Sequence, residues 1–257
     1  MRTIFILALS AVLIIPRPAL AAIGCSLSNP AQDLKYLFPE MTSFKEEAKD
    51  MTKIKEGEKL YKNLKERLGS DLDQVYETFD TPYTVYTVFK GQDVIGIVHG
   101  VNVPGKGGVI QIFLSTDPKT GEIKNFFFQR LESPASKALK NKEFRAQFST
   151  LTLADFYKHD YYAAAEPASE KDKVGKIKDP ATDEQSKPDY QATLRGIRKN
   201  LILLDMFVYE LKNEPYYERA KESIAKFKSE KKAAAGGENP GDIKPPGQAK
   251  SDPEEKK

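Results

Sequence analysis

Alternating apolar and polar positions dominate the middle of the chain and predict a run of β-strands. Four segments carry β-branched and aromatic residues at alternate positions or in short apolar runs, as half-buried strands do. These segments are residues 83–89, 94–101, 109–114 and 123–131. Because each connection is short, we expect neighbouring strands to be antiparallel. The pattern therefore predicts a four-strand meander.

The connections between these strands have the chemistry of turns. Residues 117–121 read Asp-Pro-Lys-Thr-Gly, so proline presets one φ angle and glycine supplies a positive one. Between the second and third predicted strands, Gly105, Gly107 and Gly108 flank Lys106. Glycine allows close backbone approach, and successive N–H groups in such a loop can form an anion-binding nest. The loop is a candidate phosphate site, with a plain hairpin turn as the alternative.

Apolar residues spaced three and four positions apart predict helices before and after the strands in the sequence. Residues 60–68 carry leucine at every fourth position and are followed by Gly69, a typical C-cap. The strongest helical pattern covers residues 188–210, and weaker ones cover 136–148 and 214–232. Together these patterns predict an α+β fold in which helices pack on an antiparallel sheet.

Composition divides the chain into four parts. Residues 1–24 have the layout of a signal peptide, and 25–74 form an N-terminal tether and helical region. Residues 75–232 form the α+β domain with its C-terminal helices. The last part, 233–257, contains one isoleucine and no aromatic residue. Because such a segment cannot bury enough apolar surface to order itself, we expect a disordered C-terminal tail.

The N-terminus indicates export. Arg2 precedes an apolar run over residues 4–15, which is too short to span a bilayer. Residues 19–21 fit an ordinary cleavage site, whereas residues 22–25 resemble a bacterial lipoprotein signal. Lipidation of Cys25, the only cysteine, would explain an unpaired cysteine in an exported protein, and an incidental thiol is the alternative. We expect the periplasm or the outer face of a bacterial membrane, with a lipid anchor at Cys25.

Charge and residue usage exclude several functional classes. Removing residues 1–24 takes away Arg2 and Arg17, so Lys+Arg falls from 40 to 38 against 37 acidic residues, a net charge of +1. These charges are mixed along the chain, which argues against nucleic acid as a partner. The two histidines, His99 and His159, are far apart, and the common hydrolase and zinc-protease motifs are absent. We expect His99 to be a half-exposed sheet residue.

The order of these features resembles the FMN-binding domain found in the flavin-carrying subunits of Rnf-type and sodium-translocating quinone reductase complexes, and in related exported flavoproteins. The resemblance covers about residues 75–210, including the glycine loop and the Glu-Ser-Pro that follows the fourth strand. It implies that FMN lies against these two loops. The implied cofactor-binding residues are Gly105, Lys106, Gly107, Gly108, Glu132, Ser133 and Pro134.

In the same family, FMN is carried on the threonine of a Ser-Gly-Ala-Thr segment that opens a helix. Residues 179–182 read Asp-Pro-Ala-Thr just before the strong helix, where a phosphate would meet helix N–H groups. A second Ala-Thr ends at Thr193. The resemblance implies attachment at Thr182 or Thr193. The Gly-Leu-Gly of the family reads Ala-Ser-Lys at 135–137, and non-covalent FMN or a lost site are the alternatives.

The resemblance implies an electron carrier rather than a turnover enzyme, because the flavin carries the redox chemistry and the protein supplies position and electrostatics. The leading prediction is an exported, lipid-anchored FMN protein that passes electrons between a membrane reductase and an extracytoplasmic acceptor protein. One of the three phenylalanines at 126–128 would contact the flavin, or they alternate between the core and the far face. Two other functions stay open: a non-redox binding or scaffold lipoprotein, and an FMN-dependent reductase of a small substrate.

Overall fold

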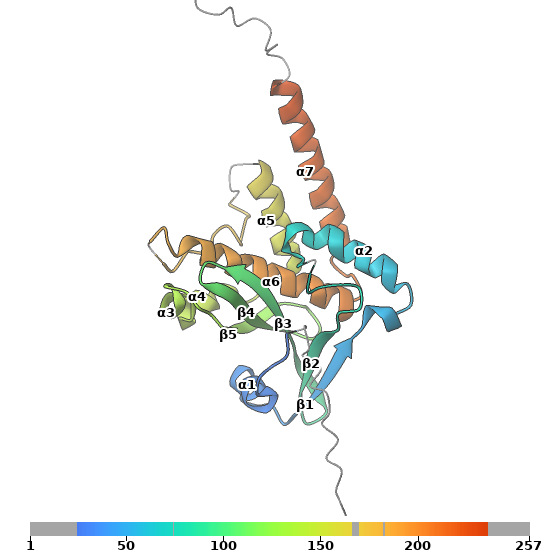
Figure 1. Cartoon of the computed structure of the whole chain (residues 1–257), viewed down its shortest axis with the longest axis vertical. Helices are drawn as coiled ribbons and strands as arrows, with labels where there is room; N and C mark the ends of the chain where they lie inside the picture. The colour runs from blue at the N-terminus through green and yellow to red at the C-terminus, as the bar shows by residue number, and fades with distance from the viewer. Residues whose placement is uncertain (1–24, 74, 166–169, 182, 236–257) are drawn as a thin grey trace, which may run out of the picture.

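The fold is built on a five-stranded antiparallel sheet with the strand order β1-β2-β3-β4-β5 (Figure 1). The computed structural model describes residues 25–73, 75–165, 170–181 and 183–235. The strands are β1 (Ser43–Lys49), β2 (Tyr83–Lys90), β3 (Asp93–Gly105), β4 (Gly108–Thr116) and β5 (Ile123–Arg130). The helices are α1 (Pro30–Leu37), α2 (Gly57–Leu68), α3 (Ser136–Leu139), α4 (Lys142–Ala146), α5 (Leu153–Ala165), α6 (Lys187–Phe207) and α7 (Glu214–Ala235).

The structure confirms the predicted α+β class and the antiparallel meander, and it adds one strand. β1 pairs along its whole length with β2, from Ser43 opposite Phe89 to Lys49 opposite Tyr83. Its sequence, Ser-Phe-Lys-Glu-Glu-Ala-Lys, is mostly exposed and lacks the apolar alternation that marked the other strands. Charged residues on an edge strand discourage pairing with other chains, and they also hide the strand from a pattern search.

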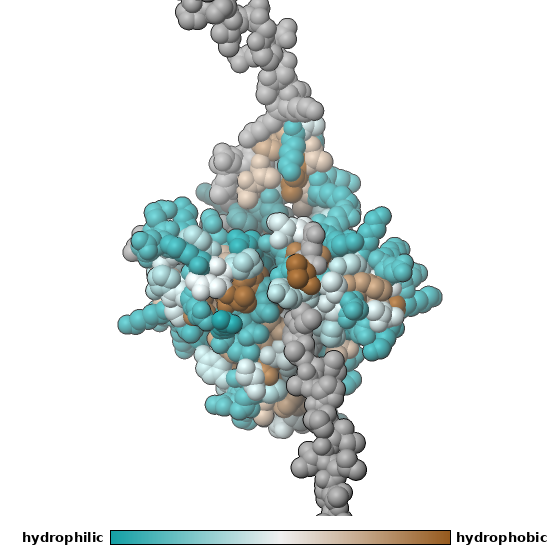
Figure 2. Space-filling view, viewed as in Figure 1, coloured by the Kyte–Doolittle hydropathy of each residue, from teal (hydrophilic) through white to brown (hydrophobic). Residues whose placement is uncertain are grey.

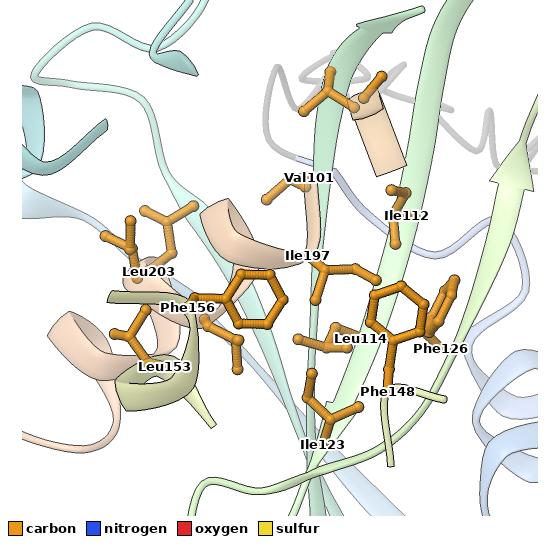
Figure 3. Packing of buried hydrophobic residues seen from close by; sticks show 14 of the residues in the cluster. Val101, Ile112, Leu114, Ile123, Phe126, Phe148, Leu153, Phe156, Ile197 and Leu203 are labelled. Atoms are coloured by element: carbon orange, nitrogen blue, oxygen red, sulfur yellow. The ribbon is translucent and has the colours of Figure 1, made fainter. Parts of the chain in front are cut away.

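Most helices cover one face of the sheet, with α6 lying directly across β3 and β4 (Figure 1). The large core lies between α6 and the strands. Burial of its side chains supplies the main stabilisation, at roughly 25 cal/mol per Å² of apolar surface. Figure 3 shows strand side chains meeting side chains from helices and from the turn after α4: Val101, Ile112, Leu114, Ile123 and Phe126 with Phe148, Leu153, Phe156, Ile197 and Leu203.

A smaller core lies on the opposite face under α1. Cys25, Leu27 and Phe38 pack there against the sheet. Residues at the start of the predicted tether therefore belong to the folded part of the chain. The three consecutive phenylalanines alternate: those at 126 and 128 join the large core, whereas Phe127 stacks on Phe113 of the smaller one, with ring centroids 5.6 Å apart.

The four segments predicted as helices are helical with two differences, and the structure adds α1 and α5, which the sequence pattern did not predict. The segment 136–148 forms two short helices because Asn141 caps a new helix, its side chain accepting the Glu143 N–H. α7 runs to Ala235, so the first residues of the predicted tail are helical. The predicted signal peptide and residues 236–257 lie outside the described residues. Within the described ranges, no helix has both the length and the apolar character needed to cross a bilayer.

His99 corrects one prediction, because it is 1% exposed rather than half-exposed. It points from β3 towards α6, where its Nδ1 lies 2.8 Å from Oδ1 of Asn200. Burial lowers the pKa of His99 to about 4; the Asn200 hydrogen bond opposes the shift and the charge of Lys199 adds to it. The ring is therefore neutral at physiological pH.

We expect acid to destabilise the protein through His99. Between pH 6.5 and about 4 the unfolded chain binds a proton at this ring and the folded chain does not, so stability falls as the pH is lowered through that window. The loss approaches about 3 kcal/mol. Urea unfolding of wild type and His99→Gln across this pH range measures the loss of unfolding free energy. The glutamine variant is the reference, because its neutral amide cannot titrate. A stability difference that stays constant with pH would contradict this assignment.

Candidate functional site

The two loops singled out from the sequence touch each other. A Cβ at position 107 would lie 2.0 Å from the carbonyl oxygen of Glu132, so only glycine allows this approach. Gly108 has φ of 137°, and a Cβ there would lie 3.4 Å from Oε2 of Glu132. The meander explains the meeting, because Gln111 near the start of β4 pairs with Arg130 at the end of β5.

The glycine loop already bonds a carboxylate of the chain itself. Asp189, in the first turn of α6, is fully buried and accepts the backbone N–H of Lys106 at 2.6 Å. Its Oδ2 is buried without a hydrogen-bond partner among the described residues. A carboxylate suits a helix N-terminus. A phosphate at this N–H would meet that negative charge, so the junction does not fit a phosphate.

The predicted attachment residues are not exposed at this junction, as far as the structure describes them. Thr193 is fully buried in α6, and its hydroxyl donates to the backbone carbonyl of Asp189 at 2.8 Å. A phosphoester at Thr193 would require α6 to open. Thr182 lies outside the described residues. The hydroxyl of Ser133 accepts the N–H of Ala135 at 3.0 Å, and Pro134 is exposed.

A pocket lies beside the glycine hairpin, where one edge of β3 has no strand neighbour among the described residues. The pairing of β2 with β3 stops at Val85 opposite His99, whereas β3 and β4 pair as far as Gly105 opposite Gly108. The space left has a volume of about 610 Å³, the size of a cofactor site. We call it the edge pocket. It is lined by Cys25, Tyr83, Val101, Asn102, Val103, Pro104, Val109 and Lys199, and by 70–73, Tyr76 and Glu77, among others.

The walls of the edge pocket combine apolar side chains with one unsatisfied hydroxyl. On the face shown in Figure 2, apolar atoms gather over the β3 and β4 region. The hydroxyl of Tyr83 is buried and has no hydrogen-bond partner among the described residues, and burial raises its pKa. Leaving such a group unpaired costs about 1–3 kcal/mol. Because Tyr83 also lines the pocket, this hydroxyl is the group that a bound ligand would satisfy if the wall opened towards it.

Lys199 takes the place of the missing strand neighbour. Its ammonium donates to the backbone carbonyls of Asn102 at 3.3 Å and Asp71 at 2.9 Å, and it pairs with Glu77 at 2.5 Å. The carbonyl at the edge of β3 is thereby satisfied without a strand. Among the described residues that line the pocket, Lys199 is the one cation, against the carboxylates of Asp71, Asp73 and Glu77.

Cys25 lies in the same wall as a buried thiol. Its Sγ donates to Oδ1 of Asn102 at 2.9 Å and accepts from Nε2 of Gln111 at 3.1 Å. Burial raises the pKa of this thiol to about 12. A lipid on this sulfur would have to displace both contacts. The arrangement therefore favours the alternative of an incidental, unmodified thiol.

Apart from Cys25, the sequence did not single out the polar groups of the edge pocket. Tyr83 reads as the first residue of a strand, and Lys199 reads as one charge on a long helix. They meet Glu77 only through tertiary structure, so no local motif marks them. The described residues contain no group of three or more His, Cys, Asp or Glu side chains placed to hold a metal ion.

Comparison with known proteins gives a likeness of fold. No family model and no curated protein sequence matches the chain. Among solved structures, NqrC of Shewanella oneidensis is similar, with a TM-score of 0.41 and 12% sequence identity. The alignment covers 78% of this chain and 93% of the NqrC chain. A likeness at this level concerns the course of the backbone alone.

Proposed function

We propose that this chain is an exported flavin-binding electron-transfer protein, and that the edge pocket takes the flavin ring. The observation that carries the proposal is the pocket itself, where valines of β3 and β4 meet Tyr83, whose buried hydroxyl has no hydrogen-bond partner among the described residues. An isoalloxazine ring is flat and mostly apolar, with carbonyl and imide groups along one edge. Such a ligand matches apolar walls that also hold a few polar groups. FMN is the flavin that the sequence resemblance implies.

The residues fit the ring of FMN better than its phosphate. The volume of about 610 Å³ accommodates a tricyclic ring, and Tyr83 and Asn102 provide hydrogen-bonding groups in the wall. The anion position expected at Lys106 is taken by Asp189. The proposal therefore places ring recognition in the edge pocket and assigns no phosphate contact to the glycine loop.

The roles of the chain's own residues follow from their contacts. A bound flavin supplies the redox chemistry, and the protein positions it and tunes its surroundings. Lys199 holds Asp71 and Glu77 against β3 through its bonds to both residues and to the carbonyl of Asn102. Tyr76 and Val109 are exposed at the rim, and apolar surface of this kind suits transient contact with a partner protein. Redox partner proteins would therefore dock over the mouth of the pocket.

The proposal includes export but not a lipid anchor. The signal peptide lies outside the described residues, so export stands on the sequence pattern. The thiol of Cys25 is hydrogen-bonded to the side chains of Asn102 and Gln111. We propose that Cys25 follows ordinary cleavage and packs as an unmodified side chain.

Filling the mouth of the pocket should weaken flavin binding. In a titration of the purified chain with FMN followed by flavin fluorescence, we expect saturable binding by wild type. Val109→Trp should weaken it at least about tenfold, because the indole would occupy the mouth. Val94→Trp is the matched control, since Val94 is 39% exposed and Val109 is 42% exposed, and Val94 does not line the pocket. No saturable binding, or equal loss in both variants, would sink the proposal.

A second candidate is a non-redox binding protein that uses the same pocket. The carboxylate of Asp189 at the Lys106 N–H favours it, because this contact replaces a phosphate site. It predicts that flat, redox-inactive aromatic ligands protect the chain against thermal unfolding while FMN and riboflavin do not. Tighter binding of flavin than of such ligands would remove this candidate.

A further inference from the structure

We infer that Asp189 is a specificity-determining residue that prevents the phosphate of a flavin from adding affinity at the edge pocket. The site would then accept riboflavin, which lacks the phosphate, at least as well as FMN. This inference rests on the proposed function, because it concerns the ligand class of the same pocket.

The first support is the way the loop is built around the carboxylate. A Cβ at position 105 would lie 2.9 Å from Oδ1 of Asp189 and 2.5 Å from Cδ1 of Ile110. Gly105 therefore leaves room for the carboxylate to reach the N–H of Lys106. The contact is short and lies next to Pro104, which lines the edge pocket. A glycine loop of the kind that elsewhere receives a ligand's anion here receives the chain's own anion.

The second support is the unsatisfied oxygen of the same residue. Oδ2 of Asp189 is buried and has no hydrogen-bond partner among the described residues. Its negative charge is therefore not offset by a donor at that atom. A phosphate near the Lys106 N–H would be repelled by it, and the repulsion is poorly screened because the carboxylate is buried.

The third support is independent of Asp189 and comes from the pocket wall. Asp71, Asp73 and Glu77 line the pocket, and the one lining cation among the described residues is Lys199. Its ammonium already pairs with Glu77. The guanidinium of Arg195 is also paired, because its Nε lies 3.4 Å from Oδ1 of Asp71. The wall thus disfavours an anionic group and accepts a neutral ring.

The test compares FMN with riboflavin on the same protein. We expect wild type to bind riboflavin as tightly as FMN or more tightly. Asp189→Asn keeps an acceptor for the Lys106 N–H but removes the charge, and it should shift the ratio of the two dissociation constants towards FMN by about tenfold. Asp93→Asn is the matched control, because it changes the net charge equally at the exposed far end of β3. A wild-type preference for FMN of tenfold or more, or an unchanged ratio in Asp189→Asn, overturns the inference.

A second arm needs no flavin and separates this inference from the proposed function. Melting temperatures are measured in inorganic phosphate and in chloride at equal ionic strength. We expect no phosphate-specific rise for wild type and a rise for Asp189→Ser, whose loop N–H is free for an anion. A phosphate-specific rise in wild type refutes the role of Asp189. If neither flavin binds wild type, the proposed function fails while this arm still decides the role of Asp189.

Discussion

Replacing Tyr83 with phenylalanine should weaken flavin binding about tenfold while leaving the free chain as stable as wild type or more stable. In the free chain the hydroxyl is buried without a partner among the described residues, so removing it removes a desolvation cost. The ring keeps its packing against Phe207, with centroids 5.2 Å apart. With a ligand bound, the same hydroxyl would make a hydrogen bond, and its loss then costs affinity.

The control for this variant is a tyrosine on the same strand that does have a partner. The hydroxyl of Tyr86 accepts the backbone N–H of Leu27 at 3.0 Å, on the opposite face of the sheet. Tyr86→Phe leaves that buried N–H unpaired, so it should destabilise the chain by about 1 kcal/mol and leave flavin affinity unchanged. Urea unfolding without ligand and FMN titration measure both quantities. If the two variants behave alike, Tyr83 is not a ligand-binding residue.

Replacing Arg67 with methionine should destabilise the protein by about 3–5 kcal/mol. Arg67 reaches from α2 into the helical layer, where its buried guanidinium lies 3.2 Å from Asp205 and 3.3 Å from Glu214. It also donates to the hydroxyl of Tyr157 and lies over the ring of Tyr217. Burial raises the pKa of Asp205. Hydrogen bonds from Asn213 and the charge of Arg67 act in the opposite direction and lower it. Without Arg67, α6 would hold a buried carboxylate that has lost its cation.

Two further variants show whether the unpaired charge causes this loss. Asp205→Asn in the Arg67→Met background removes the unpaired carboxylate charge and should restore part of the lost stability. Lys221→Met breaks an exposed ion pair with Glu66, which joins α2 to α7 as the Arg67–Glu214 pair does, and it should have little effect. Chemical unfolding of the four proteins measures the differences. Equal losses in Arg67→Met and Lys221→Met would show that burial of the pair is not important.

The sheet was accessible from the sequence for physical reasons, whereas the contact between the two loops was found only in the structure. Apolar alternation marked β2 to β5, and short turns made them antiparallel. An antiparallel meander brings the start of β4 and the end of β5 to one edge, which is why Gly107 reaches Glu132. β1 escaped prediction because its exposed, charged residues carry no apolar period. His99 was misjudged because the sequence does not show that α6 lies over that part of β3.

The edge pocket was not accessible in the same way. It exists because β2 stops pairing before β3 does, and strand register of this kind has no local signature. Tyr83, Glu77 and Lys199 come from three separate segments, and only the packed structure brings them to one wall. Asp189 suits a helix N-terminus by its position in the sequence, but its bond to Lys106 depends on the path of the β3–β4 hairpin. Pattern reasoning therefore located the scaffold, whereas none of the residues that it singled out in the two loops lines the edge pocket.

The most direct test of the flavin site is a crystal structure of the chain grown with excess FMN. Our account predicts the ring in the edge pocket, in contact with Tyr83 and Val109, with Asp189 still bonded to the Lys106 N–H. A ring bound elsewhere, or a phosphate at Lys106 in place of Asp189, would contradict it.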